Sequence, residues 1–181
     1  MTFPVRPTSQ PLLGTKSHVA ILLALHLGRK NLGAQLDSFA DQTHADWSLI
    51  VSDDGPPDGA HQIIDAFEAR LPERTITIID GPRLGFAANF VSLISTTPDT
   101  ANFAALSDQD DVWLPGKLAR AIDMLGDADH EVPALYAGRT TICDADLRPL
   151  RPSPEFKRQP GFRNAMVQSI GGGNTMVLNR A

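Results

Sequence analysis

Between residue 18 and about residue 138, short apolar segments alternate with segments whose apolar residues recur every three or four positions. The short segments are 19–25, 47–52, 75–79, 102–107 and 134–138. Each reads as a buried strand, and the segments between them read as amphipathic helices. Strands that alternate with helices are typical of a mostly parallel sheet with helices on both faces. The sequence therefore predicts an α/β fold.

The periodic segments predict four helices. Their apolar positions are Leu32, Leu36 and Phe39; Ile63, Ile64, Phe67 and Leu71; Phe86, Phe90, Leu93 and Ile94; and Leu118, Ile122 and Leu125. Asp58 is a candidate N-cap for the second helix, and Pro115 marks the start of the fourth. Residues 147–162 contain four prolines and show no periodicity, which predicts a loop. The glycines at 171–173 predict a tight turn that leads into a last strand.

Charge and cysteine content exclude several classes of protein. The 181 residues include 16 Lys and Arg against 21 Asp and Glu, a formal net charge of −5, which argues against a general nucleic-acid-binding surface. A single cysteine, Cys143, excludes an intrachain disulfide and a cysteine-rich zinc site. No apolar run approaches the ~20 residues of a transmembrane helix. We expect a flexible lead-in at 1–17 and one domain over 18–181, with no transmembrane segment and no nucleic acid partner.

Two acidic clusters follow predicted strands. Asp53 and Asp54 follow the second strand, and Asp108, Asp110 and Asp111 follow the fourth. Ligands of open α/β sheets bind at the carboxyl ends of the strands, so both clusters belong at a binding edge. Crowded carboxylates favour a divalent cation, and Mg²⁺ or Mn²⁺ completes its shell with substrate phosphates. The pattern predicts a metal site for a diphosphate-bearing substrate, although either cluster alone also fits a plain turn or a helix entry.

Two further residues, Trp113 and His26, have side chains that could take part in a binding site. Trp113 follows the second cluster and fits a core position better than a substrate wall. His26 is the only histidine placed at the end of a predicted strand, and the histidines show no metal-ligand spacing. Of the histidines, His26 alone is therefore expected near the site.

Several segments, in this order, resemble the family 2 glycosyltransferases of GT-A fold. They are 25–28, 35–43, 50–55, 83–90, 106–118 and 172–180. The Ser-Asp-Asp-Gly at 52–55 resembles a motif at the opening of that family, and Arg-Leu-Gly at 83–85 is similar to its Asn-Leu-Gly segment. The Asp-Gln-Asp-Asp at 108–111 resembles its Asp-x-Asp motif in the form of bacterial rhamnosyltransferase-like members.

The resemblance implies a role for each matching residue. Asp54 would bind the nucleotide base, the backbone of Leu25, His26 and Leu27 would line base and ribose, and Arg83 and Gly85 would lie near the nucleotide. Asp108 would hold ribose and metal, and Asp110 would be the main metal ligand. The vicinity of donor and acceptor would be formed by Asp111, Trp113, Gly172, Gly173 and Asn174.

The resemblance also implies an activity. The protein would transfer a sugar from a nucleotide-sugar to a glycan or lipid-linked acceptor by metal-assisted inverting displacement, in bacterial surface polysaccharide synthesis. It would work in the cytoplasm or at the inner face of the membrane. The catalytic base of this family is an acidic residue downstream of the last matching strand, so we expect it beyond Ala181 and the domain to be C-terminally incomplete. Asp144 and Asp146 fit turn positions better than a base.

Alternative functions stay open at this point. Without that base, 18–181 would be a non-catalytic nucleotide-sugar-binding or interaction module. Met176 and Leu178, uncovered by a following segment, would then favour a homo-oligomer. The sequence at 108–112 formally fits the nucleophile loop of haloacid dehalogenase phosphatases, but that loop normally follows the first strand. A Rossmann dehydrogenase is excluded, because no Gly-x-Gly-x-x-Gly follows the first strand.

Overall fold

The computed structural model describes residues 17–126, 132–155, 161, 163, 166, 167, 169 and 171–181. The predicted lead-in lies almost entirely outside this part of the chain. The strands are β1 (Val19–Leu25), β2 (Trp47–Asp53), β3 (Ile76–Asp80), β4 (Phe103–Ser107), β5 (Leu135–Ala137), β6 (Thr141–Cys143), β7 (Pro149–Pro152) and β8 (Met176–Asn179). The helices are α1 (Leu32–Ala40), α2 (Ala60–Arg70), α3 (Phe86–Ser95), α4 (Lys117–Leu125) and the 3₁₀ turn η1 (Gly173–Thr175).

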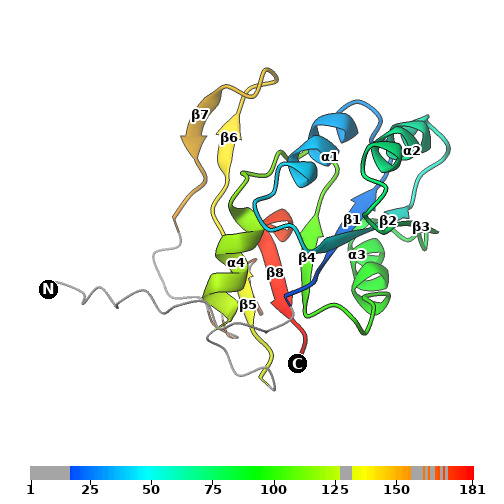
Figure 1. Cartoon of the computed structure of the whole chain (residues 1–181). Helices are drawn as coiled ribbons and strands as arrows, with labels where there is room; N and C mark the ends of the chain where they lie inside the picture. The colour runs from blue at the N-terminus through cyan, green and yellow to red at the C-terminus, as the bar shows by residue number, and fades with distance from the viewer. Residues whose placement is uncertain are drawn as a thin grey trace, which may run out of the picture.

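Six strands form one sheet in the order β3-β2-β1-β4-β8-β5 (Figure 1). Strands β1 to β4 pair in parallel, and β8 runs antiparallel to both β4 and β5. The central strands β1 and β4 are buried along almost their whole length, which explains why they read as continuous apolar runs. The α/β prediction is confirmed.

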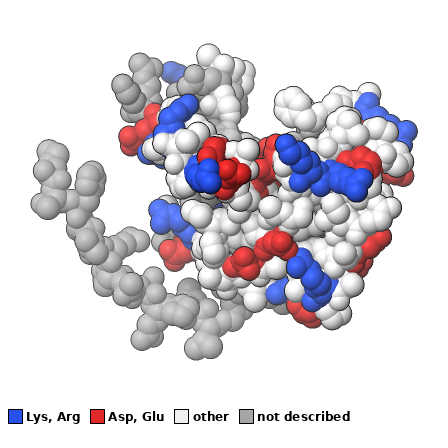
Figure 2. Space-filling view, turned by 90° about the horizontal axis from the view of Figure 1, so that it is seen from above, with Lys and Arg blue, Asp and Glu red and all other residues white. Residues whose placement is uncertain are grey.

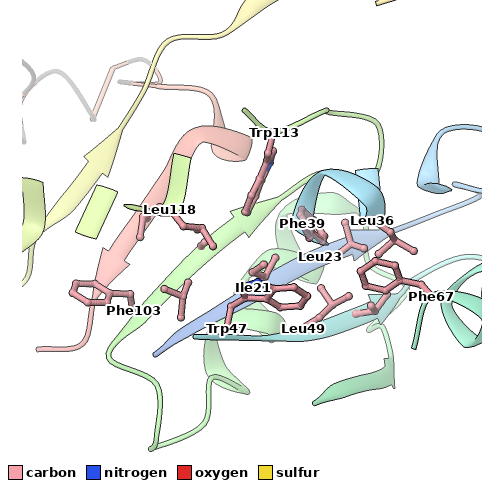
Figure 3. Packing of buried hydrophobic residues seen from close by; sticks show 14 of the residues in the cluster. Ile21, Leu23, Leu36, Phe39, Trp47, Leu49, Phe67, Phe103, Trp113 and Leu118 are labelled. Carbon is pink, nitrogen blue, oxygen red and sulfur yellow. The ribbon is translucent and has the colours of Figure 1, made fainter. Parts of the chain in front are cut away.

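Helices cover both faces of this sheet. One core cluster joins alternate residues of β1 to α1, α2 and α4, and Figure 3 shows Ile21 and Leu23 among the side chains of these helices. The other cluster joins Ala20 and Leu22 to Leu93 of α3, on the opposite face. Met176 and Leu178 of β8 are partly buried against this second cluster, and Val177 is fully buried in the first. The strand β8 is thus packed on both sides of the sheet.

The prediction of which residues of α3 face the core is partly wrong. Leu93 is fully buried and Phe90 packs against the core, but Phe86 is 81% exposed and Ile94 is 43% exposed. Asn89, one turn before Leu93, is the other buried residue of this helix. The helix therefore contacts the sheet along a narrow row, and its first turn extends past the carboxyl edge.

The loop predicted for 147–162 is also partly wrong. Its first part contains β7, which pairs with β6 in a hairpin that projects from the body of the fold (Figure 1). A two-stranded hairpin leaves one edge of each strand unpaired, so the prolines of β7 are tolerated there. Residues 156–160 and 162 of the predicted loop lie outside the described residues. In the hairpin turn, Asp144 accepts hydrogen bonds from the amides of Asp146 and Arg148, in agreement with a turn role.

Local signals at two helix starts are close to the prediction. Gly59 in the left-handed conformation (φ 92°) occupies the N-cap of α2, and Asp58 accepts a hydrogen bond from the Ala60 amide at 2.9 Å. Asp58 thus caps this helix from one residue earlier than a standard N-cap. The helix α4 begins two residues after Pro115, at Lys117.

Candidate functional site

A cleft of about 760 Å³ lies at the carboxyl ends of β1, β2 and β4. The parallel register aligns Leu25 with Asp53 and Leu23 with Ser107, so the segments that follow these three strands emerge at one edge of the sheet. Its volume falls within the range of small-molecule sites. Both acidic clusters contribute to this cleft, as expected for a ligand site of an open α/β sheet.

The cleft gathers about half of the predicted site residues. Those that line it are Leu25, His26, Asp54, Arg83, Gly85, Asp108 and Asp110. Those that do not line it are Leu27, Asp111, Trp113, Gly172, Gly173 and Asn174. The lining also includes residues to which sequence analysis gave no role in the site: Ala24, Gly55, Pro56, Pro57, Phe86, Asn89 and Gln109.

Main-chain contacts fix the Asp54 carboxylate. The residue is nearly buried, its amide donates to the Leu25 carbonyl at 2.8 Å, and its Oδ1 accepts a hydrogen bond from the Arg83 amide. Arg83 has a positive φ of 57°, a conformation that non-glycine residues rarely adopt. A Cβ at Gly81 would lie 2.7 Å from Asp54 Oδ1, so only glycine fits there. The carboxylate therefore has one orientation at the floor of the cleft.

Asp53, in contrast, serves the fold of its own turn. Its Oδ1 accepts a hydrogen bond from the Gly55 amide at 3.0 Å, and its Oδ2 lies 2.8 Å from Nε2 of His61 on α2. The residue does not line the cleft. Within the first acidic cluster, the structure thus separates a turn carboxylate from a cleft carboxylate.

The side chain of Gln109 joins the two sides of the cleft. Its Nε2 donates to the His26 carbonyl at 2.8 Å, and its Oε1 accepts from the His26 amide at 2.6 Å. A Cβ at Gly28 would lie 2.5 Å from Leu25 Cδ1 and 2.7 Å from Gln109 Oε1. This amide therefore sets the position of the chain after β1, and a side chain at position 28 would displace the Gln109 amide and the Leu25 side chain. The sole sequence signal for Gln109 is an uncharged polar residue inside an acidic run.

Asn89 is a second polar link that supports the cleft. It is almost fully buried, and its Nδ2 donates to the Ser52 carbonyl at 3.1 Å, while its Oδ1 accepts from the Ser52 hydroxyl. These bonds attach α3 to the end of β2. An amide within the apolar stripe of the predicted helix is the signal that could have identified it.

The second acidic cluster holds negative charge that its surroundings only partly compensate. Burial raises the pKa of Asp108, and the charges of Asp111 and Asp110 raise it further, against the opposing charge of Lys117. Burial also raises the pKa of Asp111, against a hydrogen bond from the Asn174 side chain. Among the described residues, no hydrogen-bond donor contacts the Asp108 carboxylate. A cation beside these acids would relieve the repulsion between their charges.

The side chains available as metal ligands fit a hard divalent cation. Asp108 and Asp110 both line the cleft and offer only oxygen ligands, which Mg²⁺ and Mn²⁺ prefer. Within the described ranges, no three His, Cys, Asp or Glu side chains converge as a ready metal site. Two carboxylates suffice where the ligand itself supplies phosphate oxygens.

Trp113 belongs to the core and not to the lining. It is 5% exposed, and its ring packs edge-on against Phe39 with centroids 4.7 Å apart (Figure 3). The Lys117 ammonium lies 3.1 Å from the centroid of the Trp113 ring. The indole thus packs beneath the turn 108–111, which we call the acidic turn.

The outer surface bears charges of both signs. On the face seen in Figure 2, acidic and basic side chains lie side by side, without one continuous basic area. No helix in the described part of the chain has the length and apolar character needed to cross a membrane.

Comparison with known proteins places these features in a family. The model of glycosyl transferase family 2 matches residues 21–177. The dTDP-rhamnosyl transferase RfbG of Shigella flexneri is 30% identical over 105 residues, which are 57% of this chain and 36% of the relative. An uncharacterised glycosyltransferase of Nostoc sp. is 25% identical over 138 residues, 72% of this chain and 41% of the relative. The chain thus spans about two fifths of the length of these curated relatives.

Solved structures show the same fold. The mannosyltransferase PcManGT from Pyrobaculum calidifontis, in complex with GDP-Man and Mn²⁺, aligns with a TM-score of 0.55 at 18% identity, over 60% of this chain and 32% of that one. Residues 1–349 of S. aureus TarS, in complex with UDP, align with a TM-score of 0.51 at 18% identity, over 65% and 33%. The expected GT-A fold is confirmed, and the family match over most of its length shows that the chain belongs to glycosyl transferase family 2.

Proposed function

We propose that the cleft binds a nucleoside-diphosphate sugar and that the protein transfers the sugar to a glycan or lipid-linked acceptor. The observation that carries this proposal is the convergence of Asp54, Asp108 and Asp110 from two separate strand ends on one cleft. The relative that is a dTDP-rhamnosyl transferase, and the fold neighbours in complex with GDP-Man and Mn²⁺ or with UDP, support this class of donor. Bacterial surface polysaccharide synthesis, on the cytoplasmic side of the membrane, is the setting we propose.

Within this proposal, the cleft residues divide the donor between them. Asp54, oriented by Arg83, accepts hydrogen bonds from the base with its second oxygen, and Leu25 and His26, which line the cleft, face base and ribose. Arg83 and Gly85 lie along the nucleotide. Asp108 binds ribose and shares the divalent cation with Asp110, which is the main ligand. Phe86, which is exposed, and Pro56 and Pro57 are apolar residues in the lining of the cleft.

The proposed reaction is a single inverting displacement at the anomeric carbon. Mn²⁺ or Mg²⁺, when bound, supplies positive charge that stabilises the departing diphosphate. The acceptor hydroxyl must lose its proton to a base, and we assign that role to no described residue. Asp144 and Asp146 are held in the β6–β7 turn, where Arg148 lies 2.9 Å from Asp146.

A second candidate is a module that binds nucleotide-sugar without turnover. The specific observation in its favour is that Asp144 and Asp146, the acids considered as a base, are held in the β6–β7 turn and do not line the cleft. The two candidates share the cleft and differ only in transfer.

One set of measurements separates them. Titration calorimetry of the purified chain with UDP, GDP and dTDP, each with Mn²⁺ and with EDTA, should show binding of at least one nucleotide that depends on the metal. Transfer or hydrolysis is then measured with the sugar derivatives of that nucleotide. Binding with turnover supports the enzyme, and binding without turnover supports the module. If no nucleotide binds, the proposed donor site is wrong.

A further inference from the structure

Lys117, the first residue of α4, reaches from that helix to the turn before β8. Its Nζ donates a hydrogen bond to the Asn174 carbonyl at 2.5 Å, and it lies 3.1 Å from the centroid of the Trp113 ring. The negative charges of Asp111 and Asp108 act on the same ammonium, while burial lowers the pKa of Lys117 to about 6. One side chain therefore contacts the acidic turn, its supporting indole and a segment 57 residues away along the chain.

Asn174 takes part in the same contact between the turn before β8 and the turn after β4. We call this contact, formed by Asp111, Lys117 and Asn174, the junction. The carbonyl of Asn174 accepts the bond from Lys117, and its side chain lies near enough to the Asp111 carboxylate to oppose the rise that burial causes in the pKa of that group. A Cβ at Gly172 would lie 2.5 Å from Asn174 Oδ1, although the φ of Gly172 is an ordinary −66°. A side chain at this position would therefore displace the Asn174 amide, while the backbone conformation would accept it.

The turn that carries Asn174 is closed internally. The amide and the hydroxyl of Thr175 both donate to the Gly172 carbonyl, at 2.9 and 2.7 Å, and Thr175 is buried. With its internal bonds made, this turn is joined to the sheet by β8, which follows it, and to the acidic turn by Lys117 and by the contact between Asn174 and Asp111.

The junction lies outside the nucleotide cleft. Asp108 and Asp110 line the cleft, whereas Asp111, Lys117 and Asn174 do not. If the base lies at Asp54 and the diphosphate at Asp108 and Asp110, as proposed above, the sugar would lie beyond the diphosphate. The strand β8, which follows the turn 171–175, pairs beside β4, from which the acidic turn emerges. In that proposed arrangement, the sugar would be on the side of the cleft nearest the junction.

We infer that Lys117 is a positioning residue that holds the turn 171–175 against the acidic turn, so that Asn174 and Asp111 form a fixed wall for the donor sugar. This inference rests on the proposed function. It predicts that Lys117 affects recognition of the sugar and leaves recognition of the nucleotide unchanged.

The test compares Lys117→Met with Arg120→Met, which removes a basic side chain of similar length at an exposed position of the same helix. Amide hydrogen exchange at 172–176 should accelerate at least about tenfold in Lys117→Met and stay unchanged in Arg120→Met. With Mn²⁺, the affinity for whichever of UDP, GDP and dTDP binds most tightly should stay within about twofold. The affinity for its sugar derivative should fall by about tenfold, since the sugar loses its wall. Lys117→Arg should restore part of both effects, because it again offers a donor to the Asn174 carbonyl.

A second variant keeps the inference testable if Lys117→Met fails to fold by circular dichroism. Asn174→Ala leaves the main-chain acceptor of Lys117 intact and removes only the bond to Asp111, so it should produce the same selective loss of sugar affinity. Unchanged exchange at 172–176, or an equal loss of nucleotide and nucleotide-sugar affinity, would overturn the inference. Wild-type chain that binds no nucleotide would refute the proposed function, and the exchange measurement would still decide whether Lys117 holds the turn.

Discussion

The two acidic turns of the cleft have similar sequences and opposite electrostatic states. In the turn after β2, Asp53 and Asp54 accept hydrogen bonds from the amides of Gly55 and Arg83. In the turn after β4, burial and mutual repulsion raise the pKa of Asp108, and burial raises the pKa of Asp111. The first turn has its carboxylates bound by the protein itself, whereas the second retains charge that a ligand or cation can compensate.

This difference separates two uses of a buried carboxylate. A carboxylate that already accepts main-chain hydrogen bonds has a fixed orientation and can select among ligands by hydrogen bonding. A carboxylate beside other uncompensated acids binds cations, because the cation relieves repulsion that exists without it. We therefore expect substitutions in the two turns to have different consequences.

The largest effect is expected from Asp110→Asn, which removes a charged oxygen ligand from the second turn. Affinity for the preferred nucleoside diphosphate in Mn²⁺ should fall on the order of 100-fold, to the level seen in EDTA. Titration calorimetry measures this, with Asp123→Asn on the exposed side of α4 as the matched control. An Asp110→Asn variant that keeps its manganese dependence would show that the second turn does not bind the metal.

In the first turn, Asp54→Asn should weaken nucleotide binding by about tenfold and leave the manganese dependence in place. The amide keeps an acceptor for the Arg83 N–H and changes the hydrogen-bond pattern offered to the base. The loss should be greater for UDP and dTDP than for GDP. Equal losses for all three nucleotides would reduce Asp54 to a turn residue.

Asp54→Ala tests how much the same residue contributes to the free energy of unfolding. It removes the acceptor of the Arg83 amide and should lower the free energy of unfolding by about 1–3 kcal/mol. Urea denaturation compares it with Asp54→Asn, for which the expected loss is smaller. If both variants are equally stable, the bond to Arg83 contributes nothing to the fold.

A smaller effect on stability is expected when the side chain of Gln109, which links the two sides of the cleft, is replaced. Gln109→Leu keeps the size of the side chain and loses both bonds to the His26 main chain, which should cost about 1–2 kcal/mol of stability. The control, Gln62→Leu on the exposed face of α2, should stay within about 0.5 kcal/mol. Equal stability of the two variants would contradict a structural role for the Gln109 amide.

The smallest effect, and the only stabilising one, is expected from Asp108→Asn in the absence of metal. Because the pKa of Asp108 is raised above 3.8 in the folded chain, the folded state holds this proton at a pH where the unfolded state has released it. Wild type therefore loses this contribution as the pH rises above 3.8. The variant should lack that decline and gain less than about 1 kcal/mol at pH 7, given partial solvent screening. Urea unfolding from pH 4 to 7 measures the difference, and a destabilised variant would contradict the uncompensated charge.

Sequence analysis succeeded where one local rule decides the outcome. The strands around the cleft are long apolar runs that the sequence alone identifies. Because the carboxyl ends of parallel strands form the binding edge of such a sheet, the sequence also predicts that Asp54, Asp108 and Asp110 lie together at that edge. It could not separate Asp53 from Asp54, since that distinction depends on His61 and on the main chain of Arg83. It assigned no role to Gln109, whose partner His26 is 83 residues away along the chain. It also misread Pro149–Pro152, because prolines exclude a central strand but not a hairpin.

The crowding at Gly28 has a consequence for how this family can vary. A side chain at position 28 would collide with the Gln109 amide and with Leu25, so a larger residue there requires these side chains to move or to be shorter. A relative that carries a larger residue at 28 should also carry a shorter one at 109, and its chain after β1 should then be free to take another path. Positions 28 and 109 should therefore covary, and their joint replacement is a route by which the family could reshape the mouth of this cleft without altering its acids.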